Sequence, residues 1–237
     1  MHLSGSLARA TRVLRQESRE DLSEYAMHII DLTHPVSGSI PVYFPWHPAT
    51  VLERTANYGE HSCVVTRLIM GTHTGTHIDA PSHIFEGMHH IDGYDPSLWY
   101  LRAQVLDVTP RAPRQEITVR ELRRKRVRKG GAVILKTGWD RYFGRPDYYA
   151  TYPPLGADAA EYLVECGVRA VAADTPFTLE VHKILLKEGI PLITNLNNTG
   201  RLKRGSVRLV AAPLLIQGGD GAPARVFAVV SDTRGGR

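Results

Sequence analysis

The chain has 237 residues, of which 43% are hydrophobic, 22% are charged and 8% are aromatic, and its formal net charge is +5. This composition is typical of a globular protein and excludes intrinsic disorder as the default state. The length suits one large α/β domain as well as two small domains.

The first 26 residues form a segment of their own. They contain no apolar core of the kind that a secretory signal requires. Their apolar residues at positions 3, 7, 10 and 14 are spaced like one face of a helix. We expect a helical arm over residues 1–26 that packs on the body or on a partner subunit, followed by one domain over residues 27–237. The sequence leaves open whether Met1 or Met27 is the natural start.

Short apolar runs alternate with helical segments along the rest of the chain. In its second half, each predicted helix is followed by a predicted strand, an order that indicates an α/β fold. The predicted helices begin near 118 and cover 158–166 and 179–188. The predicted strands cover 27–32, 62–70, 103–108, 132–136, 168–173, 190–193, 207–216 and 224–230.

Much of the positive charge lies in one run, Arg123 to Lys129. Thr118 and Glu121 have the spacing of a capping box, which places this run at the C-terminal end of a helix, where Arg and Lys are favoured. A phosphate-binding patch is the alternative. Because no aromatic residue interleaves the run and no nucleic-acid motif surrounds it, we favour a solvated helix end and expect no nucleic-acid partner.

Cysteine content and hydropathy bear on location. Cys63 and Cys166 form no CxxC pair, and two cysteines in a chain of this size make no disulfide framework. No stretch approaches the ~18 apolar residues of a membrane span. We therefore expect a cytoplasmic protein without a membrane partner.

The segment from Gly71 to His83 carries the clearest chemistry. Its sequence, GTHTGTHIDAPSH, disfavours a helix because glycine, proline and β-branched threonines oppose one. In a straight strand, His73 and Asp79 would lie roughly 20 Å apart, at ~3.3 Å per residue. Ligands of one metal each lie ~2.0–2.2 Å from it. If His73, His77 and Asp79 bind one metal, the segment must therefore curl, and Gly75 supplies the backbone freedom.

Two imidazoles and a carboxylate suit Zn²⁺, Mn²⁺ or Fe²⁺ and leave coordination positions for water. A hydrolytic metal needs such a position. His83 is then either a further ligand or an unligated proton donor and acceptor. The nearby His89-His90-Ile91-Asp92 has a similar composition, but we favour a surface loop there.

The same segment resembles the signature H-x-G-T-H-x-D-x-P-x-H of the cyclase family of metal-dependent hydrolases, which includes kynurenine formamidases, isatin hydrolases and trans-dienelactone hydrolases. All seven fixed positions match. The resemblance extends over most of the chain from residue 29 onward. It is carried further by the segments Ile30–Pro35, Ile40–Tyr43, Lys136–Trp139, Val171–Pro176 and Gly219–Arg225.

The resemblance implies an α/β fold of the swivelling β/β/α type, a single domain with a β-barrel-like core. It also implies a homodimer or a larger homo-oligomer. It makes His83 the proton donor and acceptor, and His182 a ligand of a second metal in two-metal members. The ligands of the first metal become His73, His77 and Asp79.

Aromatic residues upstream of this segment are candidates for substrate binding. Tyr43 falls where the formamidases place a substrate-facing aromatic residue. With Phe44 and Trp46 it would form an apolar wall for a flat ring. A plain core or subunit-interface role is the alternative.

The chain departs from the family pattern at Thr194. The two-zinc members carry a glutamate there, twelve residues after the histidine that corresponds to His182, and it ligates both metals. A neutral hydroxyl is a poor substitute for an anionic oxygen between two dications. We therefore expect one divalent metal, Zn or Mn, per chain rather than two. Glu180 and Glu188 lie near His182 in the sequence, without any sign that they turn toward it.

These observations predict a metal-dependent hydrolase that cleaves a small aryl formamide, cyclic amide or lactone. Two alternatives remain at this point. One is a cyclase or lyase that uses the same metal without net hydrolysis. The other is a family member that binds metal but has lost catalysis, an alternative that Thr194 suggests.

Overall fold

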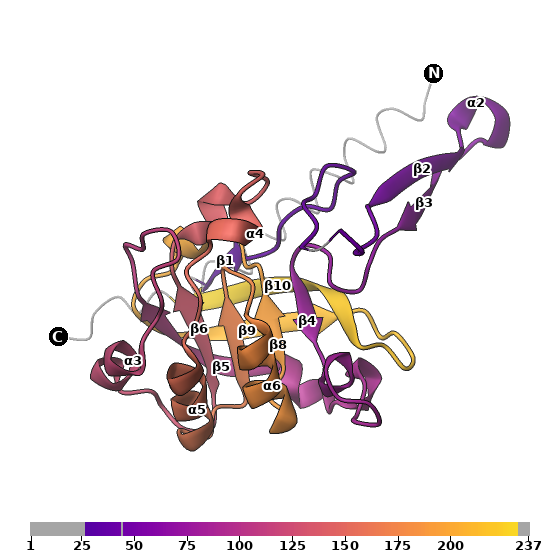
Figure 1. The fold of residues 1–237 in the computed structure, drawn as a ribbon. Helices are drawn as coiled ribbons and strands as arrows, with labels where there is room; N and C mark the ends of the chain where they lie inside the picture. Colours follow the sequence, from indigo (N-terminus) through magenta and orange to yellow (C-terminus); the bar gives the residue numbers. More distant parts are fainter. Residues whose placement is uncertain (1–26, 44, 232–237) are drawn as a thin grey trace.

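Seven strands close into a barrel in the computed structural model, which describes residues 27–43 and 45–231 (Figure 1). Around the ring the order is β10-β4-β8-β7-β6-β5-β9, and β9 pairs again with β10. The predicted α/β domain with a barrel-like core is confirmed. The seven strands are β4 (His77–Asp79), β5 (Tyr100–Asp107), β6 (Ala132–Lys136), β7 (Ala170–Ala173), β8 (Leu192–Thr194), β9 (Gly205–Pro213) and β10 (Gly221–Ser231).

Strand β10 holds the barrel together because it pairs with three neighbours. Its first residues pair with β4, and its second half pairs with β1 (Met27–Asp31) along the same edge. On its other edge it pairs with β9. The predicted arm over residues 1–26, and Phe44, lie outside the described residues.

Strands β5, β6, β7 and β8 run parallel, so each connection must cross from one end of the barrel to the other. The crossovers contain α3 (Val119–Lys125), α5 (Ala157–Glu165) and α6 (Leu179–Lys187), which cover the outside of these strands (Figure 1). The shorter helices are α2 (Tyr58–His61), α4 (Tyr148–Thr151) and five 3₁₀ turns at Pro81–His83, Ile91–Gly93, Pro96–Trp99, Trp139–Tyr142 and Thr199–Arg201. Among the described residues, no helix has the length and apolar character to cross a membrane.

Local sequence signals explain where these helices begin and end. The predicted capping box of Thr118 and Glu121 starts α3. Thr178 caps α6 by accepting a hydrogen bond from the backbone N–H of Val181 at 3.3 Å. Helix α5 is followed by Gly167 in the left-handed region, with a φ of 62°. The predicted helices over 158–166 and 179–188 lie within one residue of the observed ones, and α3 begins within one residue of its predicted start. Helix α3 ends at Lys125, however, so Arg126 to Lys129 of the basic run lie beyond it.

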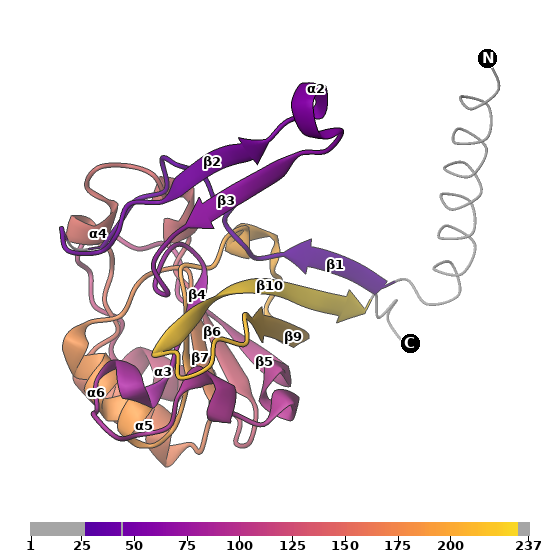
Figure 2. The ribbon, with the colours of Figure 1, turned by 90° about the vertical axis from the view of Figure 1, so that its right-hand side faces the viewer.

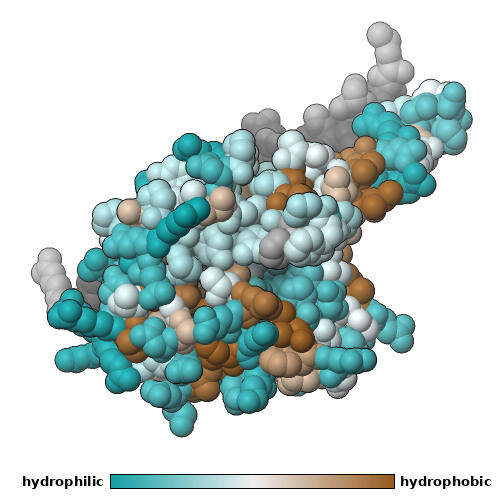
Figure 3. Space-filling model, in the orientation of Figure 1, coloured by the Kyte–Doolittle hydropathy of each residue, from teal (hydrophilic) through white to brown (hydrophobic). Residues whose placement is uncertain are grey.

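A hairpin of β2 (Val51–Ala56) and β3 (Val65–Ile69) projects from the barrel (Figures 1 and 2). Strand β2 is absent from the sequence prediction, because its residues are exposed and carry no alternation of apolar and polar side chains. Every residue of β3 is exposed, and Figure 3 shows hydrophobic surface where the hairpin leaves the body. A lone two-stranded hairpin is marginally stable in water, so this one depends on its attachment to the body.

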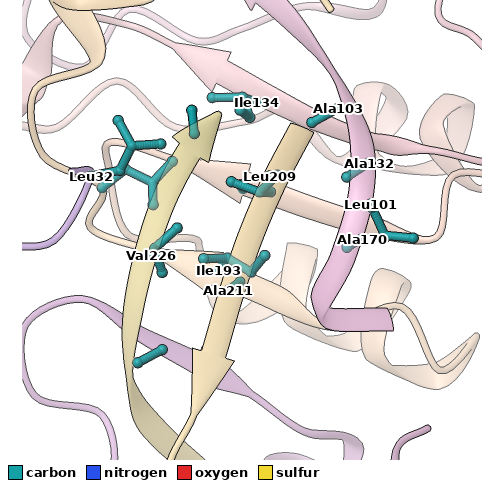
Figure 4. Packing of buried hydrophobic residues seen from close by; sticks show 14 of the residues in the cluster. Leu32, Leu101, Ala103, Ala132, Ile134, Ala170, Ile193, Leu209, Ala211 and Val226 are labelled. Atoms are coloured by element: carbon teal, nitrogen blue, oxygen red, sulfur yellow. The ribbon is translucent and has the colours of Figure 1, made fainter. Parts of the chain in front are cut away.

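The core lies in two layers because side chains alternate along the parallel strands. Ile134 on β6 and Ile193 on β8 point into the barrel, where they meet Leu209 of β9 (Figure 4). Their neighbours Val133 and Leu192 point outward against the helices. Many interior positions are alanines, which a narrow barrel can accommodate. They are Ala103, Ala132, Ala170, Ala172, Ala211, Ala222, Ala224 and Ala228.

Asp174, the residue that follows β7, has a structural role. Its fully buried carboxylate follows β7 and accepts hydrogen bonds from the backbone N–H groups of Thr137 and Gly138, the latter at 2.7 Å. The hydroxyls of Thr137 and Thr199 donate to it at 2.6 Å each. The carboxylate thus ties the ends of β6 and β7 to the turn at Thr199–Arg201.

Replacement of this carboxylate tests its structural role. We expect Asp174→Asn to lower the free energy of unfolding by about 2–4 kcal/mol, because an amide N–H would face groups that are themselves donors. Urea denaturation followed by circular dichroism measures the change. The exposed Asp158→Asn makes the same change in charge and should stay within about 0.5 kcal/mol. Equal stability of the two variants would contradict this role.

Candidate active site

The predicted curl of the histidine-rich segment is present. His73 lies in a turn before β4, whereas His77 and Asp79 lie on the strand itself. Gly75 makes the turn with a φ of 65°, and a Cβ atom there would lie 2.6 Å from Cδ1 of Ile40. The glycine is therefore required both for its backbone conformation and for lack of space.

Asp79 is the centre of the cluster, and its side chain is 1% exposed. Its Oδ1 lies 2.6 Å from Nδ1 of His73 and 3.3 Å from Nε2 of His77. Its Oδ2 lies 3.3 Å from Nε2 of His182. One buried carboxylate therefore faces three imidazoles that come from a turn, from its own strand and from helix α6.

Backbone carbonyls orient two of these rings. The Nδ1–H of His77 donates to the carbonyl oxygen of Gly75, and that of His182 donates to the carbonyl oxygen of Thr178, both at 2.8 Å. In each ring Nε2 is then the nitrogen that faces Asp79. Metal-binding histidines are commonly held in this way, by a hydrogen bond from the nitrogen that does not bind the metal.

His83 and Asp220 form the second half of the site. Oδ2 of Asp220 lies 2.8 Å from Nε2 of His73 and 3.4 Å from Nδ1 of His83. The rings of His73 and His83 lie close together, with centroids 3.8 Å apart. The sequence identified His83 but missed Asp220, which was visible there only as a polar residue in a glycine-rich turn.

The histidines and aspartates of this cluster shift one another's pKa values. Burial alone would raise the pKa of Asp79, yet the imidazoles of His77, His182 and His73 hold it well below its usual range. Hydrogen bonds from His73 and His83 lower the pKa of Asp220. Burial opposes a charge on His73, but Asp220 and Asp79 raise its pKa to about 9. In this form of the site, the carboxylates are charged and an imidazolium balances them.

The residues of the cluster fit a divalent cation. Oδ2 of Asp79 is buried without a hydrogen-bond partner among the described residues. One candidate ligand atom from each of His73, His77 and Asp79 lies within 4.8 Å of the others. Asp79, His83 and His182 form a second such group, and His73, His83 and Asp220 a third. Buried imidazole nitrogens around a carboxylate are the ligands that zinc and manganese sites use.

Thr194 does not reproduce the family glutamate. It lies on β8, where its hydroxyl is within 3.0 Å of both ring nitrogens of His77. Glu180 and Glu188, the nearest carboxylates in the sequence to His182, are exposed and do not replace it. The additional carboxylate of the site comes from Asp220, which immediately precedes β10.

A cavity of about 510 Å³ opens above the cluster. Tyr43 lines it and contacts the ring of Tyr149 edge-on at 5.0 Å. Its hydroxyl lies 3.3 Å from that of Tyr152. Trp46 also lines the cavity but is 74% exposed, which places it at the mouth. His47, which the sequence analysis did not single out, lines the cavity as well, with its ring centroid 6.4 Å from that of His73.

The cluster His89-His90-Ile91-Asp92 belongs to a surface loop, as the sequence suggested. His90 and Asp92 are exposed, and Asp92 accepts a hydrogen bond from the backbone N–H of Gly218 at 3.1 Å. His89 packs edge-on against Tyr94. These residues form none of the potential metal-ligand groups found in the described part of the chain.

A family model described as "Putative cyclase" matches residues 30–178, which is more than half of the chain. This chain belongs to the cyclase family. A kynurenine formamidase of Bacillus cereus is 30% identical over 205 residues, which cover 83% of this chain and 94% of the relative. The kynurenine formamidase of Erythrobacter litoralis is 29% identical over 210 residues, 84% of this chain and 92% of the relative.

Solved structures share the fold of this cyclase-family chain. Isatin hydrolase A from Labrenzia aggregata superposes with a TM-score of 0.81 at 24% identity, covering 93% of this chain and all of the other. A protein described as a potential metal-dependent hydrolase with cyclase activity has a TM-score of 0.71 at 28% identity, covering 86% and 98% of the two chains.

Close packing at Gly221 provides a test of the role of His73. A Cβ atom at Gly221 would lie 2.6 Å from the carbonyl oxygen of Ile78 and 2.7 Å from Cε1 of His73. We therefore expect Gly221→Ala to displace His73 and to weaken Zn²⁺ or Mn²⁺ binding at least about tenfold, as measured by competition with a chelator.

Gly200→Ala is the matched control, because its Cβ atom would have no neighbour within 4 Å and its φ is not in the left-handed region. The free energy of unfolding of the metal-free proteins reports separately any damage to the pairing of β4 with β10. Unchanged metal affinity in Gly221→Ala would contradict the placement of His73 among the ligands.

Proposed function

We propose that this chain is a metal-dependent hydrolase that cleaves a small aryl formamide, cyclic amide or lactone. The observation that carries the proposal is the position of Asp79. Its buried carboxylate faces three imidazoles at the floor of a cavity whose walls contain aromatic rings. The kynurenine formamidase relatives support an amide substrate.

His73, His77 and Asp79 would hold the metal, in keeping with the closeness of their ligand atoms and the orientation of His77. A divalent metal held there supplies a Lewis acid that polarises a carbonyl group and lowers the pKa of water. The protein excludes bulk water from this group of ligands, since the side chains of His73 and His77 are only 10% and 8% exposed.

His83 is the proton carrier in this proposal. Its side chain is 27% exposed, more than that of His73 or His77, and it lines the cavity. Asp220 lies 3.4 Å from its Nδ1 and favours a proton on that nitrogen, which leaves Nε2 for exchange with the reacting groups. His83 would take a proton from the attacking water and return it to the leaving nitrogen or oxygen.

The aromatic walls would bind a flat ring. Tyr43, Tyr149 and Tyr152 form one contacting group beside the cluster, and Trp46 stands at the mouth. Aromatic surfaces arranged edge-on to each other present both faces and edges to a planar substrate. The polar phenol oxygens of Tyr43 and Tyr152 add hydrogen-bonding capacity to this otherwise apolar wall.

We expect one metal per chain, because Thr194 offers no anionic oxygen to bind a second metal. Elemental analysis of protein purified without chelator should find about one equivalent of Zn or Mn, and His182→Ala should leave that figure unchanged. About two equivalents, falling to one in the variant, would overturn this stoichiometry and make His182 a ligand of a second ion. Absence of metal after reconstitution would remove the basis of the proposed function.

We expect His83→Ala to retain its metal but to lose hydrolysis of an aryl formamide, isatin or lactone by about 10²–10⁴-fold, because proton transfer is removed. The exposed His90→Ala is the control and should keep the wild-type rate. Reaction in ¹⁸O-labelled water should place one labelled oxygen in the product. A product without label would instead indicate a cyclase or lyase, and full activity of His83→Ala would contradict its role.

Self-association remains a prediction. The exposed apolar residues of the β2–β3 hairpin, among them Leu52, Leu68 and Ile69, support a homodimer in which the hairpin contacts a second copy. Light scattering on the purified protein measures the mass of the assembly directly. A monomer at micromolar concentration would contradict the prediction.

A further inference from the structure

A second cavity, of about 570 Å³, lies on the side of the barrel that carries α3. Its walls are β5, the start of β9 and the turn that follows α3. In Figure 1 this helix lies well away from β4, which carries the metal-binding cluster, and Figure 3 shows hydrophilic surface in the same region. None of the residues that line it belongs to the candidate active site.

Four cations of this cavity are left after its two carboxylates are paired. Arg111 pairs with Glu121 at 2.5 Å, and Lys136, which lies outside the lining, pairs with Asp107 at 3.4 Å. The four remaining cations are Arg124, Lys125, Arg128 and Arg204. Of these, only Arg204 has a carboxylate of the described residues within 4.0 Å, namely Asp107 at the limit of that distance.

The basic turn is held in place by Gln104 of β5. The side-chain amide of Gln104 donates to the carbonyl oxygens of Lys125 and Arg126 at 3.2 and 3.3 Å. Its oxygen accepts the backbone N–H of Arg128 at 2.9 Å. Arg126 has a φ of 51°, a left-handed conformation that costs a non-glycine residue energy. One glutamine therefore stabilises a strained turn that brings Lys125 and Arg128 to the same cavity.

We propose that this cavity binds a small metabolite that carries two phosphate groups. Each phosphate has a charge of about −1.5 to −2 at neutral pH, so two phosphates match the four cations. Arginine suits phosphate because its planar group donates two parallel hydrogen bonds. The volume lies within the range of small-molecule sites. Among the described residues, no aromatic ring lines the cavity to stack on a base, which favours a compact anion over nucleic acid.

The test uses the metal-loaded full chain and fructose 1,6-bisphosphate as the probe, with binding followed by isothermal titration calorimetry at low salt. We expect one site per chain. Arg124→Gln/Arg128→Gln should weaken binding at least about tenfold, because charge-assisted hydrogen bonds to phosphate are lost. Arg120→Gln/Lys187→Gln removes the same charge from exposed positions outside the cavity and should change the affinity less than about twofold.

One further variant and one further ligand complete the experiment. Gln104→Ala should weaken binding as well, because the turn loses its three hydrogen bonds while every cation remains. Fructose, which carries no phosphate, should not bind. Equal weakening by the two double variants, or no binding by the wild type, would overturn the proposal. Tighter binding of a single-stranded oligonucleotide, with the same dependence on Arg124 and Arg128, would also overturn it in favour of a nucleic-acid surface.

Discussion

A buried negative charge governs the structure around the candidate active site. The carboxylate of Asp79 is almost completely removed from solvent, and an unpaired charge in that position would be strongly destabilising. Three imidazoles surround it, and each comes from a different structural element. The turn before β4, β4 itself and helix α6 must therefore all be in place before the charge is compensated.

The barrel makes that arrangement possible. Strand β4 pairs with β10 on one edge and with β8 on the other. His77 and Asp79 on β4 therefore lie next to residues of two strands that are distant in the sequence. Because Gly221 on β10 has no side chain, the ring of His73 can lie against the backbone of this strand. The preceding residue, Asp220, then comes within hydrogen-bond distance of His73. The interior alanines keep the barrel narrow, while larger residues on the outer face of the same strands anchor the helices.

Two buried aspartates show how different surroundings lead to different roles. Asp174 is saturated by hydroxyl and backbone donors, which cannot be exchanged for a ligand without loss of the fold. Asp79 faces imidazoles, which bind protons or metal ions reversibly, and one of its oxygens lacks a hydrogen bond within the described structure. Burial is common to both; the chemistry of the neighbours separates a structural carboxylate from a candidate ligand.

The sequence by itself indicated a candidate metal-binding segment rich in histidine, and it predicted most of the strands and the three longer helices, although not β2 or β4. The requirement that His73, His77 and Asp79 reach one metal predicted the curl between His73 and Asp79. Capping residues and glycines indicated the helix limits, because these are local effects of backbone geometry. Asp220, the structural role of Asp174 and the β2–β3 hairpin were decided only by the tertiary structure. Asp220 lies 147 residues from His73 in the chain, and their contact depends on the closure of β10 against β4. Long-range pairing of this kind leaves no periodic signal in the sequence, because it arises from strand register rather than from local propensity.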